Sequence, residues 1–368
     1  MRGKKINWPI TLFLMLTPVV GISGAVMISL RGDLHWQTLL LAFIWLLATG
    51  LAITAGYHRL FAHETYQANK WVKLFFLIFG AAAFQGSALE WCTDHRNHHR
   101  YSETEKDPYN IRKGFWYAHI GWLMVLDGDQ RDYGNVNDLA VDRWVHWQHK
   151  HFGWLSCLFG FIVPMLIAGA WGDWLGGLIF AGVLRTVINH HFTFCINSVC
   201  HLFGKRQYSY QQTGRDNWFT ALFTYGEGFH NFHHQFPLDY RNGIRFYHYD
   251  PTKWLIWLLS RLGLAHDLQK ISVARLTRYR LKTDEQALLT KFKQSSDALL
   301  AYVHEYLVPL RDQILQVAAR IEALEKYGKI KEYRNQLKAA RLELKYSLIV
   351  WSKLTKARLL QRHESLII

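Results

Sequence analysis

Two segments near the start of the chain carry no charged residue over a length that crosses a bilayer. They are residues 8–30 and residues 36–57, joined by a short connection. An α-helix rises 1.5 Å per residue, so the first segment alone spans about 34 Å, against about 30 Å for a hydrocarbon core. A secretory signal peptide is the rival interpretation of residues 8–30. It is disfavoured because the apolar run is too long and a second span follows at once.

A second pair of apolar segments lies in the middle of the chain, at residues 152–171 and 174–194. Gly172 and Asp173 separate the two. The later segment contains Arg185, His190 and His191, which makes it the weakest of the four spans. The pattern predicts an all-α integral membrane protein with four transmembrane helices in two hairpins.

Lysine and arginine indicate the orientation. Arg2, Lys4 and Lys5 precede the first span, whereas the two short connections hold only Arg31 between them. The loop 58–151 and the tail 195–368 are rich in both residues. By the positive-inside rule both termini and the long loop are expected in the cytoplasm, with a bacterial inner membrane as the location if the source is bacterial.

Residues 71–90 form a fifth apolar stretch, with Lys73 early in it and Gln85, Ser87 and Glu90 late. A fifth span would place the basic residues that follow outside, against the charge pattern. We therefore expect a helix that lies in or on the membrane interface.

The overall composition agrees with a membrane protein. A net charge of +15 is typical of chains that meet nucleic acid or an anionic membrane, and the four spans favour the membrane, so no nucleic-acid partner is expected. The four cysteines form no CxxC pair, which disfavours a disulfide framework and favours buried thiols. The 20 histidines are a large excess.

Nine of the histidines fall in dense clusters close to the predicted cytoplasmic ends of the spans. The clusters are His58 and His63; His95, His98 and His99; His201; and His230, His233 and His234. In each HxxHH unit, positions i, i+3 and i+4 share one helix face, so we expect three imidazoles to point toward one place. His58 and His63 differ by about 140° around a straight helix, and they meet only if that helix bends or unwinds.

Nine imidazole donors are too many for one ion and suit two ions with four or five ligands each. Imidazole suits Fe, Zn, Cu and Ni, and the spacing does not choose among them. The remaining histidines are interpreted as polar caps, headgroup contacts or other non-ligands: His35, His119, His146, His149, His151, His190, His191, His248, His266, His304 and His363.

Four motifs in this order resemble the integral-membrane fatty acyl desaturases of the Δ9 acyl-CoA (stearoyl-CoA) type, over roughly residues 36–275. They are LAITAGYHRLFAH (51–63), FQGSALEWCTDHRNHHRYSETEKDPYN (84–110), NSVCHLFG (197–204) and GEGFHNFHHQFPLDYR (226–241). The order, the spacing and the flanking residues all agree.

The resemblance implies a di-iron centre held by the nine clustered histidines, with Asn197 holding a metal-bound water. It also implies that Asp94 and Glu227 orient ligand histidines through their outer ring nitrogens. The expected reaction converts a saturated acyl chain, O₂ and two electrons into a cis alkene, at Δ9, and two waters. Zn²⁺ has no redox chemistry, so it could fill the site only as an artefact.

The resemblance further implies a bent apolar tunnel for the acyl chain. Trp91 is expected to line it, and Leu46 or Leu47 in the second span to close its far end. The substrate is either an acyl-CoA or a membrane-lipid acyl chain. Two features weaken CoA recognition: Leu126-Asp127-Gly128-Asp129 stands where the family has an Arg-Lys pair, and Thr93 stands where it has an arginine. Other bases could replace them: Arg96, Arg112 or Lys113.

No electron carrier is fused to the chain, so a separate ferredoxin-, rubredoxin- or cytochrome b5-like donor with its reductase is expected. A di-iron acyl hydroxylase or alkane monooxygenase is the alternative function, because similar histidine boxes serve it. A haem-carrying membrane protein is disfavoured, since its paired histidines would lie inside the spans.

The resemblance does not extend to the tail 283–368. We therefore predict two domains, a desaturase domain at 1–282 and a separate tail at 283–368. Its apolar residues repeat with heptad spacing from Leu299 to Leu324 and again from Tyr333 to Trp351. Tyr327-Gly328 is expected to form a turn and Pro309 to kink the first helix. The pattern predicts a basic cytoplasmic helical hairpin or coiled coil, which either packs on the desaturase domain, self-associates or binds the redox partner.

Overall fold

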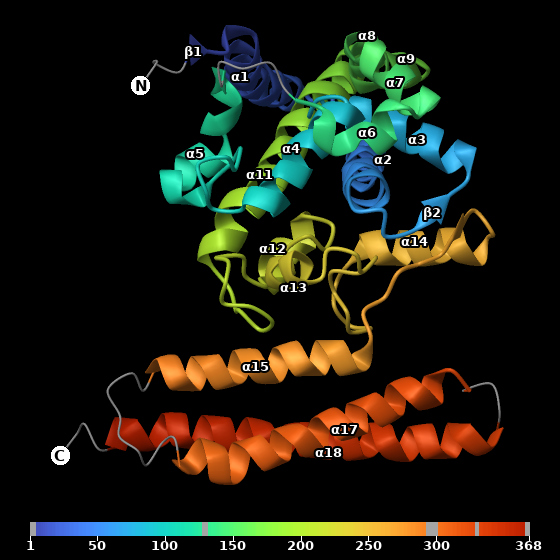
Figure 1. Cartoon of the computed structure of the whole chain (residues 1–368). Coiled ribbons are helices and arrows are strands. Elements are labelled where there is room, and N and C mark those ends of the chain that lie inside the picture. The colour runs from blue at the N-terminus through green and yellow to red at the C-terminus, as the bar shows by residue number, and fades with distance from the viewer. Residues whose placement is uncertain (1–4, 127–131, 292–300, 328–330, 365–368) are drawn as a thin grey trace. The chain divides into compact units, whose positions relative to one another are not determined.

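The structure is a computed structural model that describes residues 5–126, 132–291, 301–327 and 331–364. The chain divides into two compact units (Figure 1). The first contains residues 1–205 and 212–270, and the second contains residues 206–211 and 271–368. Each unit has a hydrophobic core of its own.

The first unit is almost entirely helical. Its main helical segments are α1 (Trp8–Arg31), α2 (Trp36–Leu51), η1 (Ala52–Ala62), α3 (Lys70–Ala81), α4 (Ala88–Tyr101), α7 (Arg143–Lys150), α8 (Phe152–Cys157), η5 (Leu158–Ile162), α9 (Val163–Gly169), α10 (Trp174–Gly176), η6 (Gly177–Leu184), α11 (Arg185–Leu202) and α14 (Pro251–Arg261). Shorter helical segments are η2 (Ile111–Lys113), α5 (Phe115–His119), η3 (Gly121–Met124), η4 (Gly134–Val136), α6 (Asn137–Ala140), α12 (Trp218–Phe223) and α13 (His230–Gln235). Two antiparallel pairs of very short strands join β1 (Lys5–Ile6) to β3 (Val125–Leu126) and β2 (Gln67–Ala68) to β4 (Ala265–His266).

Four helical runs are long and apolar enough to cross a membrane: Trp8–Arg31, Trp36–Ala62, Phe152–Gly169 and Trp174–Leu202. They match the four predicted spans, so the predicted all-α membrane fold is confirmed. The second and fourth runs continue beyond their predicted ends at residues 57 and 194. Their final turns carry polar residues, which the hydropathy pattern placed outside the membrane, but these side chains are buried within the protein.

Three of the four spans contain a π-helical segment: η1, η5 and η6. In a π-helix each N–H bonds the carbonyl five residues earlier, so the helix is wound more loosely than an α-helix. Such segments often lie at functional sites. Here η1 carries His58 and ends directly before His63.

The charged residue inside the fourth span is buried and hydrogen-bonded. Arg185 is 2% exposed, and it donates to the carbonyls of Ala181 (3.0 Å), Ala82 (2.8 Å) and Gly160 (2.8 Å). His190 bonds the neighbouring carbonyl of Ala83 at 2.9 Å. The fourth span therefore accommodates its polar residues by bonding backbone carbonyls of the break after α3 and of η5.

The predicted single helix over residues 71–90 is wrong in its extent. Helix α3 ends at Ala81, and α4 begins at Ala88. Phe84 and Gly86 between them have positive φ angles of 55° and 92°. Ser87 and Glu90 form a capping box, with Ser87 N donating to Glu90 Oε2 at 2.9 Å. The polar residues at the end of the apolar stretch are thus a helix-start signal. The interfacial position of α3 stays a prediction.

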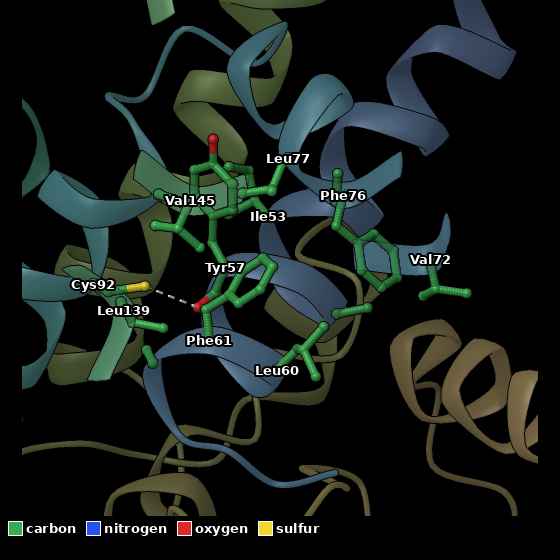
Figure 2. Close-up of a cluster of buried hydrophobic side chains, with 14 of the residues drawn as sticks. Ile53, Tyr57, Leu60, Phe61, Val72, Phe76, Leu77, Cys92, Leu139 and Val145 are labelled. Atoms are coloured by element: carbon green, nitrogen blue, oxygen red, sulfur yellow. Dashed lines mark hydrogen bonds between the residues drawn. The ribbon is translucent and has the colours of Figure 1, made fainter. Parts of the chain in front are cut away.

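The main core of the first unit surrounds η1, α3 and α4 (Figure 2). The Tyr57 hydroxyl accepts a hydrogen bond from Gln148 at 2.7 Å, and the Tyr57 carbonyl accepts one from the Cys92 thiol at 3.4 Å. Burial raises the pKa of the Cys92 thiol, so this residue stays a protonated donor. All four cysteines are free; Cys92 and Cys200 are buried as expected, whereas Cys157 is exposed. The Cys92 contact holds Tyr57, which directly precedes His58, against α4, the helix that carries His95, His98 and His99.

The second unit contains α15 (Val273–Lys291), η7 (Val303–Leu307), α17 (Val308–Glu325) and α18 (Lys331–Glu364). The predicted helix pair corresponds to η7–α17 and α18, and its heptad residues meet in one core. That core contains Val303, Leu307, Ile314, Val317, Ile321, Ala340, Leu344 and Trp351.

Two features of the second unit differ from the expected hairpin. Helix α15 adds Leu281 and Leu288 to the same core, so the unit begins near residue 271. The helix before Pro309 is π-helical and becomes α-helical at Val308, so the interruption comes before the proline. Leu299 and Gly328 lie outside the described residues.

We predict that Arg185→Met lowers the stability of the folded membrane protein, because the carbonyls of Ala82 and Gly160 lose their donor inside the bilayer. An unsatisfied buried group costs about 1–3 kcal/mol. The midpoint of thermal unfolding in detergent, followed by circular dichroism, should fall by several degrees. Arg31→Met, at the exposed last turn of α1, is the matched control and should leave it unchanged. Equal midpoints for both variants would contradict a role of Arg185 in the fold.

Candidate metal centre

The nine clustered histidines come together in two groups. The first, group A, contains His58, His63, His95, His99 and His233, and the second, group B, contains His98, His201, His230 and His234. Within each group one ring nitrogen per residue lies within 4.8 Å of all the others. Eight of the nine side chains are buried, and His99 is half-buried. The structure thus gathers every predicted ligand, five in one place and four in another.

Helix η1 aligns the first two members of group A. His63 N donates to the His58 carbonyl at 3.1 Å, five residues back. This i→i+5 bond is the π-helical pattern, and it brings together two rings that a straight α-helix would separate by about 140°. The ring centroids lie 5.0 Å apart. The expected unwinding of the helix end is therefore present, as a π-helix.

Each HxxHH box contributes to both groups, which corrects the expectation that its three rings point to one place. In α4, His95 and His99 join group A and His98 joins group B. In α13 the division is reversed, because the i, i+4 pair joins group B and the middle residue, His233, joins group A. Consecutive helix residues differ by about 100°, so the residue at i+3 lies about 60° from i and about 100° from i+4, at one side of the shared face, where its ring can join the other group.

Helix α11 supplies His201 to group B from its last turn. Figure 1 shows α11 running through the first unit, with α12 and α13 near its C-terminal end. Asn197 is half-buried one turn before His201 on the same helix, and residues four apart share a face. This position agrees with the expected water-binding role, which stays a prediction.

Within each group the inward ring nitrogens face one another. Nε2 of His58 and Nε2 of His233 are 3.0 Å apart, and those of His63 and His95 are 2.8 Å apart. In group B, His230 Nε2 lies 3.0 Å from His201 Nε2 and 2.9 Å from His234 Nε2. Imidazole nitrogens that converge in this way form a donor set that fits a bound metal ion.

Burial favours the neutral form of five of these rings. It lowers the pKa of His95, His99, His230, His233 and His234 well below the usual value, and the neighbouring rings lower it further. A neutral imidazole offers a lone pair to a metal, whereas a protonated one does not. The fold therefore supplies ligands that need not lose a proton near neutral pH.

The outer nitrogens of four ligands are held by hydrogen bonds. His58 Nδ1 lies 2.9 Å from Glu227 Oε2, and His98 Nδ1 lies 2.9 Å from Asp107 Oδ1. The other two partners are hydroxyls: Tyr109 lies 3.2 Å from His95 Nδ1 and Thr213 lies 2.8 Å from His201 Nδ1. An Nδ1–H that donates to a carboxylate leaves the Nε2 lone pair pointing inward.

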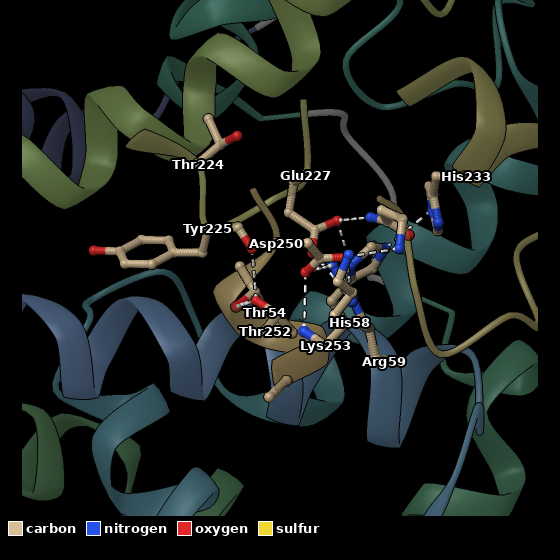
Figure 3. Close-up of polar contacts among 12 residues, drawn as sticks. Thr54, His58, Arg59, Thr224, Tyr225, Glu227, His233, Asp250, Thr252 and Lys253 are labelled. Carbon is tan, nitrogen blue, oxygen red and sulfur yellow. Dashed lines mark hydrogen bonds and ion pairs between the residues drawn. The ribbon is translucent and has the colours of Figure 1, made fainter. Parts of the chain in front are cut away.

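Glu227 is the centre of a buried ion network (Figure 3). Its carboxylate accepts from Arg59 Nη2 at 2.8 Å and also contacts His58. Arg59 donates in turn to Asp250 at 3.1 Å. Burial alone would raise the pKa of Glu227, but Arg59 and His58 hold it below its usual range. The network keeps Glu227 ionised, so it can orient His58.

Of the remaining predicted site residues, Trp91 and Asp94 lie beside the histidines of α4. The Trp91 ring stacks on His95 with centroids 4.8 Å apart. Asp94 stands beside His95 and acts on the hydroxyl of Tyr109, whose pKa is raised by burial, by Asp107 and by Asp94. Leu46 and Leu47 are half-buried in α2, away from the histidines along the same span. Their expected functional roles stay predictions.

Residues predicted as non-ligands lie outside both groups among the described side chains. His190 bonds a backbone carbonyl, and His119 lies 3.1 Å from His191 Nδ1 and 2.9 Å from the Ser198 hydroxyl. His363 lies outside the described side chains.

Several residues that orient the ligands were missed by sequence reasoning. Asp107 and Tyr109 follow the second box within DPYN, and Arg59 directly follows His58, so their places in the motifs were an available signal. Thr213 carries no such signal, because it comes from a loop and has no periodic relation to a histidine. It is itself held by Glu103, which accepts from the Thr213 hydroxyl at 2.6 Å.

Comparisons with known proteins agree with this geometry. The fatty acid desaturase family model matches residues 34–267. The chain is 46% identical over 267 residues to a probable acyl-CoA desaturase of Schizosaccharomyces pombe, covering 72% of this chain and 55% of the relative. It is 42% identical to acyl-CoA desaturase 1 of Saccharomyces cerevisiae, covering 73% and 53%. It is 36% identical to stearoyl-CoA desaturase 5 of Bos taurus, covering 77% and 86%.

The chain spans about half the length of the two yeast relatives and most of the bovine one. The family match covers more than half of the chain and includes all nine clustered histidines and three of the four spans. With its four apolar helices and its two groups of imidazole ligands, the chain is an integral membrane protein of the fatty acid desaturase family.

Proposed function

We propose that the protein is a fatty acyl desaturase that inserts a cis double bond, at Δ9, into a saturated acyl chain. The observation that carries the proposal is the convergence of nine imidazole rings into groups of five and four. The names of the relatives, acyl-CoA and stearoyl-CoA desaturases, support the substrate class. The balanced reaction consumes the acyl chain, O₂, two electrons and two protons, and it yields the alkene and two waters.

Groups A and B would each hold one iron ion. When bound, iron supplies the one-electron redox chemistry that O₂ activation and removal of hydrogen from an unactivated CH₂–CH₂ pair require. Zn²⁺ binds imidazole as well but has no redox chemistry, so zinc in purified protein would be an artefact. The chain's own part is to hold the ligands neutral, to orient them through Glu227 and Asp107, and to exclude water by burial. Asn197 would add a water-mediated contact.

The acyl chain is proposed to lie in an apolar tunnel between the spans. Trp91 stacks on His95, so it would line the tunnel beside group A. The far end would be closed by Leu46 or Leu47. Nearby, the Tyr225 hydroxyl donates to the Leu46 carbonyl at 3.0 Å, and its ring occupies the space where Gly50 has no Cβ. This contact joins the proposed tunnel end to the segment just before Glu227.

The structure narrows the candidates for a CoA-binding cation. Thr93 is buried, and Arg96 is occupied by the Ala62 and Asn135 carbonyls and by Asp138. Arg112 contacts Glu103 at 3.3 Å but has a largely exposed side chain, and Lys113 pairs with the exposed Glu105 at 3.2 Å. We therefore propose Arg112 and Lys113 as phosphate contacts of an acyl-CoA. Asp127, Gly128 and Asp129 lie outside the described residues.

We further propose that both termini and the metal centre face the cytoplasm, as the lysine and arginine pattern indicates. In a bacterium the membrane would be the inner one. Electrons would come from a separate ferredoxin-, rubredoxin- or cytochrome b5-like carrier and its reductase. The sequence predicts the tail at 283–368, and the structure extends its unit to residue 271. We propose that this basic unit either self-associates or binds the electron carrier.

The deciding experiment is product analysis in a host that lacks its own desaturase. Gas chromatography of fatty acid methyl esters should show a cis-Δ9 monoene that is absent from the empty host. Supplying labelled acyl-CoA or labelled phospholipid to isolated membranes separates the two substrate classes. A hydroxylated product would support the alternative monooxygenase, and the absence of any product with two metal ions bound would contradict the proposal.

We predict that the purified protein binds two transition-metal ions and that each group holds one. His233→Ala in group A and His201→Ala in group B should each lower the metal content, measured by inductively coupled plasma mass spectrometry, from about two to about one ion per chain or less. Both should abolish the unsaturated product while the protein still inserts in the membrane. The matched control is His304→Ala, which is exposed and should change neither quantity. Full activity of either group variant would remove that residue from the ligand set.

We predict that Leu46→Ala or Leu47→Ala shifts substrate preference from about 16 carbons toward 18. Leu46 and Leu47 precede His58 by 12 and 11 residues, or about 16–18 Å along an ideal helix. A branched side chain at the closed end excludes a longer acyl chain, since overpacking a tight cavity costs about 1–3 kcal/mol. The measurement is the ratio of the two monoenes in a competition assay. Leu39→Ala, exposed on the same helix, is the control, and an unchanged ratio for both test variants would show that this helix does not close the tunnel.

A further inference from the structure

The loop between α13 and α14 carries two large aromatic side chains into solvent. Phe246 is 89% exposed and Tyr247 is 59% exposed. The next residue, His248, is half-buried. Large apolar rings at such exposure are costly to keep in water, and clusters of them often mark an interaction site. The three consecutive rings lead from the surface into the protein.

The rings form a continuous path to group B. The centroids of Phe246 and Tyr247 are 5.2 Å apart, and those of Tyr247 and His248 are 5.1 Å apart. His248 stacks on the buried Phe229 with centroids 4.5 Å apart and planes at 9°. Phe229 directly precedes His230, a member of group B. Delocalised rings in successive contact are a favourable medium for moving an electron.

The loop is held in this arrangement by buried groups. Lys253 Nζ donates to the carbonyls of Arg245 (2.7 Å) and His248 (3.1 Å). Asp250 accepts from the backbone N–H of Gly243 at 2.9 Å. A Cβ on Gly243 would lie 2.8 Å from the Cβ of His248 and 3.0 Å from the Phe229 ring, so the stack requires glycine there. The path is therefore built into the fold.

The exposed charge beside the two rings is positive. The Arg245 guanidinium lies 5.7 Å from the Tyr247 ring and donates to its hydroxyl. The nearby carboxylates of Asp239 and Asp250 are buried and paired with Arg241 and Arg59. An exposed arginine packed on an exposed aromatic ring favours a partner with an acidic surface.

We propose that this loop is the docking site of the electron donor and that Tyr247, His248 and Phe229 carry its electrons to group B. The partner is a one-electron carrier protein with an acidic face around its redox group. This inference rests on the proposed desaturase function, which requires two electrons per double bond. Two carrier molecules would each be oxidised by one electron, and the centre would be reduced by two.

The test uses the full-length protein in nanodiscs and three acidic probes: a plant-type ferredoxin, a rubredoxin and the soluble haem domain of cytochrome b5. The carrier that binds and reduces the wild type fastest is used for the variants. Binding is measured as Kd with the oxidised carrier, a readout that does not depend on turnover. Electron transfer is measured by stopped-flow absorbance of the carrier, and dithionite serves as a small reductant that needs no docking site.

Three variants separate docking from transfer. Arg245→Glu should raise the Kd about tenfold at low salt, with a smaller effect at high salt. Tyr247→Leu should slow reduction at saturating carrier about tenfold or more and leave dithionite reduction unchanged. Gly243→Ala should shift His248 off Phe229, so it should slow transfer without changing the Kd. Arg261→Glu and Trp257→Ala, an exposed cation–aromatic pair on α14, are the matched controls and should behave as wild type.

Wild-type Kd and transfer rates in Arg245→Glu and Tyr247→Leu would overturn the proposal, as would failure of all three carriers to bind the wild type. If the loop variants lost only their association with anionic nanodisc lipids and kept wild-type carrier binding, the loop would belong to the membrane surface. That result would also overturn the docking proposal. Absence of desaturation in the wild type with dithionite as reductant would instead count against the proposed function, so the two failures are distinguishable.

Discussion

The convergence of nine imidazole rings into two groups is the constraint on which the first unit depends. Rings that must present their inner nitrogens at one point have to be held at their outer side. Glu227, Asp107, Tyr109 and Thr213 hold them at the outer nitrogens. The buried Arg59 holds Glu227 in turn. The polar network behind the ligands is thus the structural support of the site.

Looser helical winding solves two separate problems in the spans. In η1 the i→i+5 pattern brings His58 over His63, which a regular helix would separate. In the fourth span a buried cation is tolerated because carbonyls are available: Arg185 bonds one in η5 and one at the break after α3. Both arrangements place polar groups within apolar spans without exposing backbone groups to lipid.

The sequence could predict what short-range patterns encode. Hydropathy predicted the four spans, and the HxxHH spacing predicted the histidine clusters, because both depend on residues within one or two turns. It could not predict that His98 joins group B and His233 joins group A, each apart from the other two histidines of its box. This assignment follows from how α4 and α13 face each other. Thr213 was missed for the same reason. The break before α4 was encoded locally, in Ser87 and Glu90, but was interpreted as a polar helix end.

The exchange of one ring between the two boxes has a consequence for how the centre is assembled. Helices α4 and α13 each contribute rings to both groups, so the same two helices shape group A and group B. A displacement of either helix would therefore move rings of both groups at once. The geometries of the two groups are coupled through the packing of α4 against α13, and neither group can be reshaped without the other.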